Sequence, residues 1–242
     1  MILAYEDNFD GFLTAVFEAF SRKSQNISLA NIKNPLPGLL ETEHITANLT
    51  KAGRVISGMD RLNPNLKEIT YKAWLSCEED IDDAIVNTLK LGFSNHSNPM
   101  SCVYETCVKR ILFASKKVGW EVQRAYQFVR FINTGNGIYA SDYEPLYDIL
   151  HLIGRHFHAR FSDRPFIIRD ASRKIAIIST PENWTISHLS QEQSTLPFLE
   201  QDQYTDMWKS YFEILSNPQR KNLKLQQKFI PLRYRKHLTE FN

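Results

Sequence analysis

Three histidines and two arginines fall within residues 151–160, and such side chains act as acids, bases, metal ligands or anion-binding groups. On a helix, His151, Arg155 and His158 would share one solvent face, because they are spaced at i, i+4 and i+7. His156 and Arg160 would lie beside the apolar stripe. A metal site is disfavoured, because the two outer histidines would stand about two turns apart with a cation between them. We therefore expect no metal.

His156 and Arg160 need partners if they turn toward the core, because a buried polar group must be hydrogen-bonded. Asp170 follows on an adjacent predicted strand, and we expect it to pair with Arg160. The pair has two interpretations. It is a structural ion pair, or it forms a catalytic cluster together with His156.

The C-terminal stretch 218–237 is strongly basic, and it contains no acidic residue. Its cations are Arg220, Lys221, Lys224, Lys228, Arg233, Arg235 and Lys236. The whole chain has a formal net charge of +2, so the remainder is mildly acidic. Such side chains neutralise phosphates, and Phe229 and Tyr234 could stack on exposed bases. Alternatively, the stretch is a solvated tail or docks on the acidic cluster at residues 78–83, and its apolar residues, among them Leu232 and Leu238, anchor the chain end to the body.

A second basic patch lies between Lys109 and Arg130, where six basic residues accompany one acid, Glu121. Arg110 and Arg124 belong to this patch. We include it with the C-terminal stretch as a candidate surface for phosphates.

Several common classes of protein are disfavoured by the motifs that the sequence lacks. The 242 residues are 43% hydrophobic and 12% aromatic, which is typical of a globular protein. Cys77, Cys102 and Cys107 are odd in number and show no CxxC spacing, which disfavours a disulfide framework, a zinc ribbon and an iron–sulfur motif. No GxGxxG, P-loop, GxSxG or HExxH motif occurs. We expect no cofactor, no signal peptide and no membrane span, and therefore a cytoplasmic protein.

In the N-terminal part, a short strand at residues 2–5 should precede a helix capped by Asp7 or Asn8. Another helix is predicted over residues 78–91, with its acidic residues in the first turn. A loop predicted at residues 93–100 suggests a boundary between this helical part and the rest of the chain. We therefore expect a mainly helical N-terminal region, residues 1–100, packed on a core formed by residues 101–242.

In the C-terminal part, a helix should begin near Ser101, and strands are predicted at 128–132 and 138–140 around an Asn-Gly turn. A helix from Glu144-Pro145 follows, and then come strands at 165–170 and 174–178. This order predicts an α+β fold, in which a small antiparallel sheet (strand-strand-helix-strand-strand) is covered by helices. A last long helix is predicted over residues 202–215.

Short motifs that are specific in combination are spread along nearly the whole chain, and most of them lie beyond Val118. These motifs are Tyr5-Glu6-Asp7-Asn8-Phe9, Phe128-Val129-Arg130-Phe131, Glu144-Pro145, His156-Phe157, Arg160-Phe161, Ile168-Arg169-Asp170 with Arg173, and Phe229-Ile230-Pro231-Leu232-Arg233-Tyr234. In combination they resemble an uncharacterised bacterial family of proteins assigned to DNA metabolism and DNA repair. That family is described as the companion of a radical-SAM protein similar to spore photoproduct lyase. In some bacteria its C-terminal domain is fused to a uracil-DNA-binding glycosylase-like domain.

The resemblance implies DNA as a ligand and a radical-SAM protein as a partner, but it implies no reaction. Two positions depart from the family pattern. Gln123 replaces a histidine, so a reaction that required that histidine would be absent, and Arg235 replaces a tryptophan, which reduces an aromatic platform.

Three hypotheses follow. The first is a DNA-binding accessory protein that holds DNA with Arg110, Arg124, Arg130, Arg173, Phe229, Arg233, Tyr234, Arg235 and Lys236. The second is an enzyme that processes a nucleobase or a DNA lesion with His156, Arg160 and Asp170. The third is an interaction module whose basic faces bind an acidic protein.

Overall fold

The computed structural model describes residues 1–22, 27–33, 41–134, 137–195 and 230–238, together with 207, 210 and 224. Apart from Met207 and Ser210, the predicted helix over residues 202–215 therefore lies outside the described residues, and so does Phe229. The chain divides into two compact units, Met1–Gly119 and Trp120–Asn242. The division falls inside helix α5 (Thr106–Phe128), later than the boundary expected at residue 100.

The N-terminal unit contains a parallel sheet of β1 (Ile2–Tyr5), β2 (Ser28–Asn31) and β3 (Thr42–Ile45), in the order β2-β1-β3. The central strand β1 is buried along its whole length, as is expected of a parallel strand with both faces covered. Helix α1 (Phe9–Ser21) follows it. The Asn8 side chain caps α1 by accepting a hydrogen bond of 2.6 Å from the backbone N–H of Gly11, so the predicted strand, helix and cap are confirmed.

Helices complete the N-terminal unit. They are α2 (Leu49–Leu62), α3 (Leu66–Leu75), α4 (Ile81–Asn95) and the 3₁₀ helix η1 (Pro99–Ser101). Their apolar faces meet α1 and the sheet in one core that contains Leu3, Phe12, Met59, Leu89 and Ile111. The N-terminal half is mostly helical, as predicted, although α4 extends into the loop expected at residues 93–100.

Helix α5 begins at Thr106, after the start expected near Ser101, and its last residue, Phe128, was expected to begin a strand. Buried Val118, Val122 and Ala125 continue its apolar stripe at helical spacing as far as Phe128. The first strand of the C-terminal unit, β4 (Ile132–Asn133), therefore begins only at Ile132. It pairs antiparallel with β5 (Tyr139–Asp142), which confirms the predicted hairpin.

The C-terminal unit is built on a five-stranded sheet in the order β4-β5-β6-β7-β8. Its other strands are β6 (Phe166–Asp170), β7 (Ile175–Ser179) and β8 (Trp184–His188). The α+β class is confirmed, but the sheet is mixed. Strands β5 and β6 run parallel, since helix α6 (Leu150–Arg160) carries the chain across between them.

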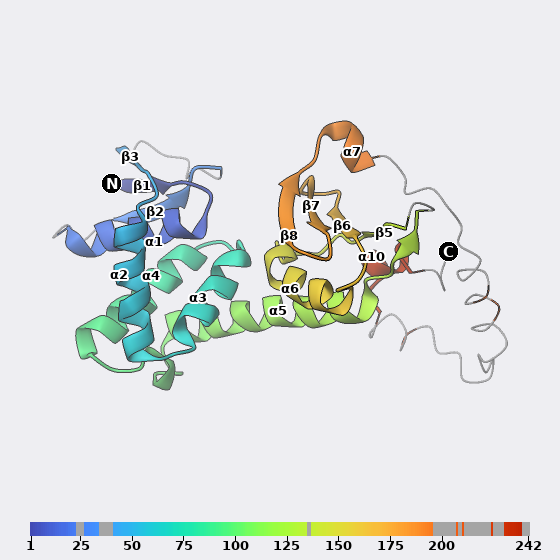
Figure 1. Ribbon diagram of the computed structural model, residues 1–242. Helices are drawn as coiled ribbons and strands as arrows, with labels where there is room; N and C mark the ends of the chain where they lie inside the picture. The colour runs from blue at the N-terminus through green and yellow to red at the C-terminus, as the bar shows by residue number, and fades with distance from the viewer. Residues whose placement is uncertain are drawn as a thin grey trace. The chain divides into compact units, whose positions relative to one another are not determined.

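Figure 1 shows α6 lying along the sheet of this unit, where it contacts β7 and β8. The helix begins at Leu150 and not at Glu144-Pro145, as the sequence had suggested. Gly154 permits the close approach to the sheet, because a Cβ atom at this position would lie 2.3 Å from the indole of Trp184. Short helices α7 (Gln191–Thr195) and α10 (Leu232–Arg235) follow.

Candidate nucleic-acid interface

The outer face of α6 carries basic side chains, two of them arginines, on a helix that contains no acidic residue. Its exposed members are His151, Arg155, His156 and Arg160. The opposite face is buried and holds Leu150, Ile153, Gly154 and Phe157. We call the four exposed residues the α6 cationic face. The sequence placed all of them on this helix, but it placed His156 and Arg160 nearer the core than they lie.

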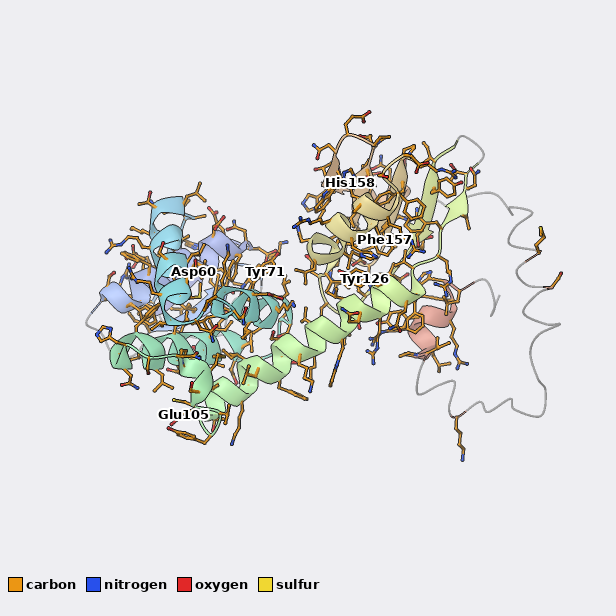
Figure 2. All side chains as sticks on the ribbon, turned by 60° about the horizontal axis from the view of Figure 1, so that its bottom comes forward. Asp60, Tyr71, Glu105, Tyr126, Phe157 and His158 are labelled. Atoms are coloured by element: carbon orange, nitrogen blue, oxygen red, sulfur yellow. The ribbon has the colours of Figure 1, made fainter. Side chains whose placement is uncertain are left out.

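An aromatic neighbour on α5 supports this face. The His156 ring lies against the Tyr126 ring, with centroids 4.0 Å apart and an interplanar angle of 31°. Tyr126 also meets the edge of the Phe157 ring at 6.1 Å, and Figure 2 shows these two side chains close together. Desolvation raises the pKa of the Tyr126 phenol. His158, at the side of the helix, lies with Nδ1 2.9 Å from Ser179 Oγ.

Asp170 is fully buried, and its partner is Arg173, not Arg160 as predicted. Its carboxylate accepts hydrogen bonds from Ser172 Oγ (2.6 Å), from the Arg173 backbone N–H (3.1 Å) and from Arg173 Nη1 (2.7 Å). The turn between β6 and β7 returns Arg173 over Asp170, whereas Arg160 is exposed on α6. The expected contact within the cluster of His156, Arg160 and Asp170 is therefore absent among the described contacts.

Arg173 fixes the segment that leads into α6. Besides its ion pair, it donates to the carbonyl oxygens of Pro145 (2.9 Å) and Leu146 (2.7 Å). Its guanidinium is thus bound to protein acceptors on both sides, and this candidate phosphate ligand has a structural role.

A buried carboxylate on α5 holds the C-terminal segment. Glu121 is 1% exposed and accepts hydrogen bonds from the Leu146 backbone N–H (2.7 Å) and from Arg233 Nη2 (2.8 Å). Arg124 lies 3.6 Å from the same carboxylate. Two of the arginines expected to hold phosphates therefore surround an internal acid.

Tyr234 is part of the core and is not free to stack on a base. It is 1% exposed, and its ring lies 5.5 Å from the rings of both Phe128 and Tyr143. Burial, reinforced by a hydrogen bond to Glu121, raises the pKa of the Tyr234 phenol to about 12. The prediction of a stacking platform at Tyr234 is wrong. The alternative, that this segment anchors the chain end, is confirmed for Leu238, which is fully buried, but not for Leu232, which is exposed.

The remaining predicted phosphate ligands also have protein partners. Arg110 lies 3.8 Å from Asp80 and donates to the Glu79 carbonyl oxygen. Arg130 donates to the Gln127 carbonyl oxygen at 2.6 Å, and Arg235 donates to the Ile230 carbonyl oxygen at 3.3 Å. Lys236 lies 2.6 Å from Glu144, and this pair is largely exposed. Surface pairs of this kind are weak, so such cations can still exchange partners.

The sequence also missed the ion pair of a buried arginine. Arg169, which is 5% exposed, donates two hydrogen bonds to Asp142 (2.6 and 2.9 Å) and a third to the Gln193 carbonyl oxygen (2.9 Å). The two residues face each other in the parallel register of β5 and β6. Only knowledge of the parallel pairing could have revealed this contact.

Two further expectations concern what the described residues contain. No group of three or more histidine, cysteine, aspartate or glutamate side chains is placed to hold a metal ion in the described part of the chain. None of the described helices is both long and apolar enough to span a bilayer.

In the comparison with protein families, residues 79–240 match a domain of unknown function, DUF4130. The chain belongs to this family. The DUF4130 match includes α5, the whole five-stranded sheet, α6 and α10, and hence every residue of the α6 cationic face. No curated protein and no solved structure matches the chain.

Proposed function

We propose that this DUF4130 protein binds DNA through the α6 cationic face and acts in DNA repair as the cytoplasmic companion of a radical-SAM protein. The observation that carries DNA binding is the charge of that face. Arg155 and Arg160 are exposed, and neither pairs with a carboxylate among the described residues.

Three carboxylates of the same unit pair with other arginines. Glu121 binds Arg233, Asp142 binds Arg169, and Asp170 binds Arg173. Unneutralised arginines on one helix face are suited to binding phosphates. Contacts to phosphate make up a large share of protein–DNA hydrogen bonds, and arginine is a common donor in them.

The surroundings of the two arginines suit a nucleic acid better than a small anion. The His156 and Tyr126 rings lie against each other on this face, and histidine and tyrosine rings can stack on unpaired bases. The role in repair and the radical-SAM partner rest on the motifs that resemble the repair family, among them His156-Phe157 and Arg160-Phe161.

DNA binding is tested by fluorescence anisotropy of the full chain with labelled single-stranded and double-stranded DNA over a series of salt concentrations. The double variant Arg155→Gln/Arg160→Gln removes two cations while keeping helix-forming side chains of similar length. The control variant Lys67→Gln/Lys90→Gln removes the same formal charge from exposed positions on α3 and α4.

For duplex DNA, each phosphate contact adds about 0.9 to the slope of log affinity against log salt. We expect the α6 variant to lower that slope by about 1.8, and the control to change it little. Wild-type protein that fails to bind either form of DNA at low salt would refute the proposed function. An equal loss in both variants would refute the assignment to α6.

A further inference from the structure

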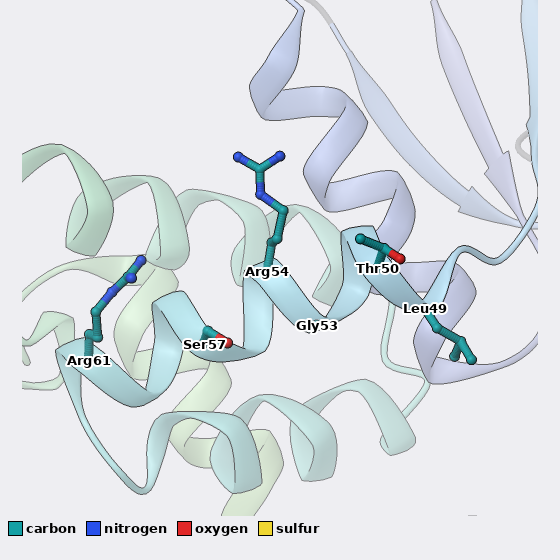
Figure 3. A pocket seen from close by; sticks show the side chains of 6 residues that line it. All are labelled: Leu49, Thr50, Gly53, Arg54, Ser57 and Arg61. Atoms are coloured by element: carbon teal, nitrogen blue, oxygen red, sulfur yellow. The ribbon is translucent and has the colours of Figure 1, made fainter.

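The N-terminal unit has a shallow pocket on the outer face of α2, far in sequence from the α6 cationic face. Its lining consists of Leu49, Thr50, Gly53, Arg54, Ser57 and Arg61. Figure 3 shows that all six residues come from α2, with the two arginine side chains extending from successive parts of the helix. The pocket therefore offers two long cations with short hydroxyl side chains between them.

Both arginines lack an acidic partner among the described residues. Arg54 is exposed, and its guanidinium lies over the Phe17 ring, 4.9 Å from the centroid, which holds the side chain in place without neutralising it. Arg61 is also exposed. Asp60 is exposed on the same helix but forms no ion pair with either arginine. The nearby acid Glu18 binds Lys51 at 2.5 Å.

The spacing along α2 fits a linear anion. Arg61 follows Arg54 by seven positions, so their Cα atoms lie about 10 Å apart along the axis at about 1.5 Å per residue. This rise corresponds to about three steps of a nucleic-acid strand at about 3.4 Å each. Thr50 and Ser57 lie on the same side of the helix, and such hydroxyls donate hydrogen bonds to phosphate oxygens.

The pocket is also open enough for a backbone to approach the helix. A Cβ atom built on Gly53 would meet no atom within 4 Å, so the glycine fills no packing role. The only large apolar side chain in the lining is Leu49, whereas protein-docking surfaces centre on buried aromatic or aliphatic anchors. Charge and shape therefore favour a phosphate backbone over an acidic protein.

We infer that the α2 face is a second nucleic-acid contact, in which Arg54 and Arg61 bind phosphates of one strand while Thr50 and Ser57 donate hydrogen bonds to it. The inference rests on the proposed function, because it names the same ligand. It goes beyond that proposal by giving the N-terminal unit a contact of its own, outside the residues that the DUF4130 family covers.

The direct test is the variant Arg54→Gln/Arg61→Gln in the full chain, titrated into labelled DNA at 50 and 200 mM salt. Each phosphate contact contributes about 0.9 to the slope on duplex DNA, so two contacts contribute about 1.8. Across this fourfold change in salt, the affinity of the wild type should therefore fall about 12-fold more than that of the variant. The control Lys67→Gln/Lys90→Gln should behave as the wild type. Melting temperatures confirm that each variant is folded.

A second pair of variants avoids the loss of the Arg54 contact with Phe17. Gly53→Glu places a carboxylate in the pocket, and Gly53→Gln places a neutral side chain of the same size there. Both fit without a clash at Cβ and should stabilise the helix, because glycine is a poor residue in a helix interior. We expect Gly53→Glu to weaken DNA binding several-fold more than Gly53→Gln.

The outcomes separate this inference from the proposed function. If the α6 variant weakens binding but the α2 variants bind as the wild type does, the second contact is refuted and the first stands. That result would also follow if an acidic protein occupied the α2 face. If the wild type itself does not bind DNA, the proposed function fails, and this inference fails with it.

Discussion

Removal of Glu121 should disturb the C-terminal unit. It is 1% exposed, and it joins α5 to two separate segments by accepting from the Leu146 backbone N–H at 2.7 Å and from Arg233 at 2.8 Å. Glu121→Ala would leave a backbone donor without its partner and a cation without its counter-charge.

The magnitude follows from the exposure of each partner. Breaking a fully buried ion pair costs about 3–5 kcal/mol. Arg233 is 35% and Arg124 is 38% exposed at the side chain, so solvent screens part of that loss. We therefore expect Glu121→Ala to lower the free energy of unfolding of this unit by about 2–3 kcal/mol. Glu121→Gln keeps an acceptor for Leu146, so it should cost about half as much.

Two assays test this expectation. Thermal unfolding should show a decrease of about 5–10 °C for Glu121→Ala, at about 2–4 °C per kcal/mol. Hydrogen exchange should show faster exchange of the Leu146 amide. The control Asp163→Asn removes an exposed carboxylate that lies 3.3 Å from Arg164, and it should change stability by less than about 1 kcal/mol. Equal stability of wild type and Glu121→Ala would refute the proposed anchoring role.

Three other predictions concern separate parts of the fold. Desolvation raises the pKa of Asp82 to about 6, so the folded protein binds this proton more tightly than the unfolded chain does. The free energy of unfolding should therefore fall by up to about 3 kcal/mol as pH rises from about 4 to about 6, and urea titrations of Asp82→Asn should lack this decrease. Gly154→Ala should lower the free energy of unfolding by about 1–3 kcal/mol, and with it the melting temperature, because its Cβ atom would clash with Trp184. Gly119→Ala should raise the melting temperature, because a Cβ atom there meets no atom within 4 Å. Tyr234→Phe should leave DNA affinity unchanged in anisotropy titrations, since the ring is buried; a loss of affinity without a loss of stability would restore it as a DNA contact.

Local signals in the sequence were sufficient for several elements. Asn8 could be identified as a cap because its oxygen acts on the next turn of the same helix. The β4–β5 hairpin followed from a turn whose residues favour positive φ, and Gly137 has φ of 75°. These features depend on neighbours within a few residues.

Long-range contacts decided what the sequence did not reveal. The parallel pairing of β5 with β6 brings Asp142 to Arg169 across 27 positions, and no local pattern encodes such a partner. Similarly, Arg233 and Tyr234 look like a basic and aromatic surface in sequence, but Glu121, 112 positions before Arg233, draws them inward. The positions of the buried acids therefore determine which arginines remain available to bind phosphate.

The most direct measurement for the proposed function is the salt dependence of DNA affinity for the wild type and for Arg155→Gln/Arg160→Gln, compared at equal folded fraction. We expect salt-sensitive binding by the wild type and a slope lower by about 1.8 on duplex DNA for the variant. Binding that is absent at low salt, or that is unchanged in slope by the two substitutions, would contradict an interface on the α6 cationic face.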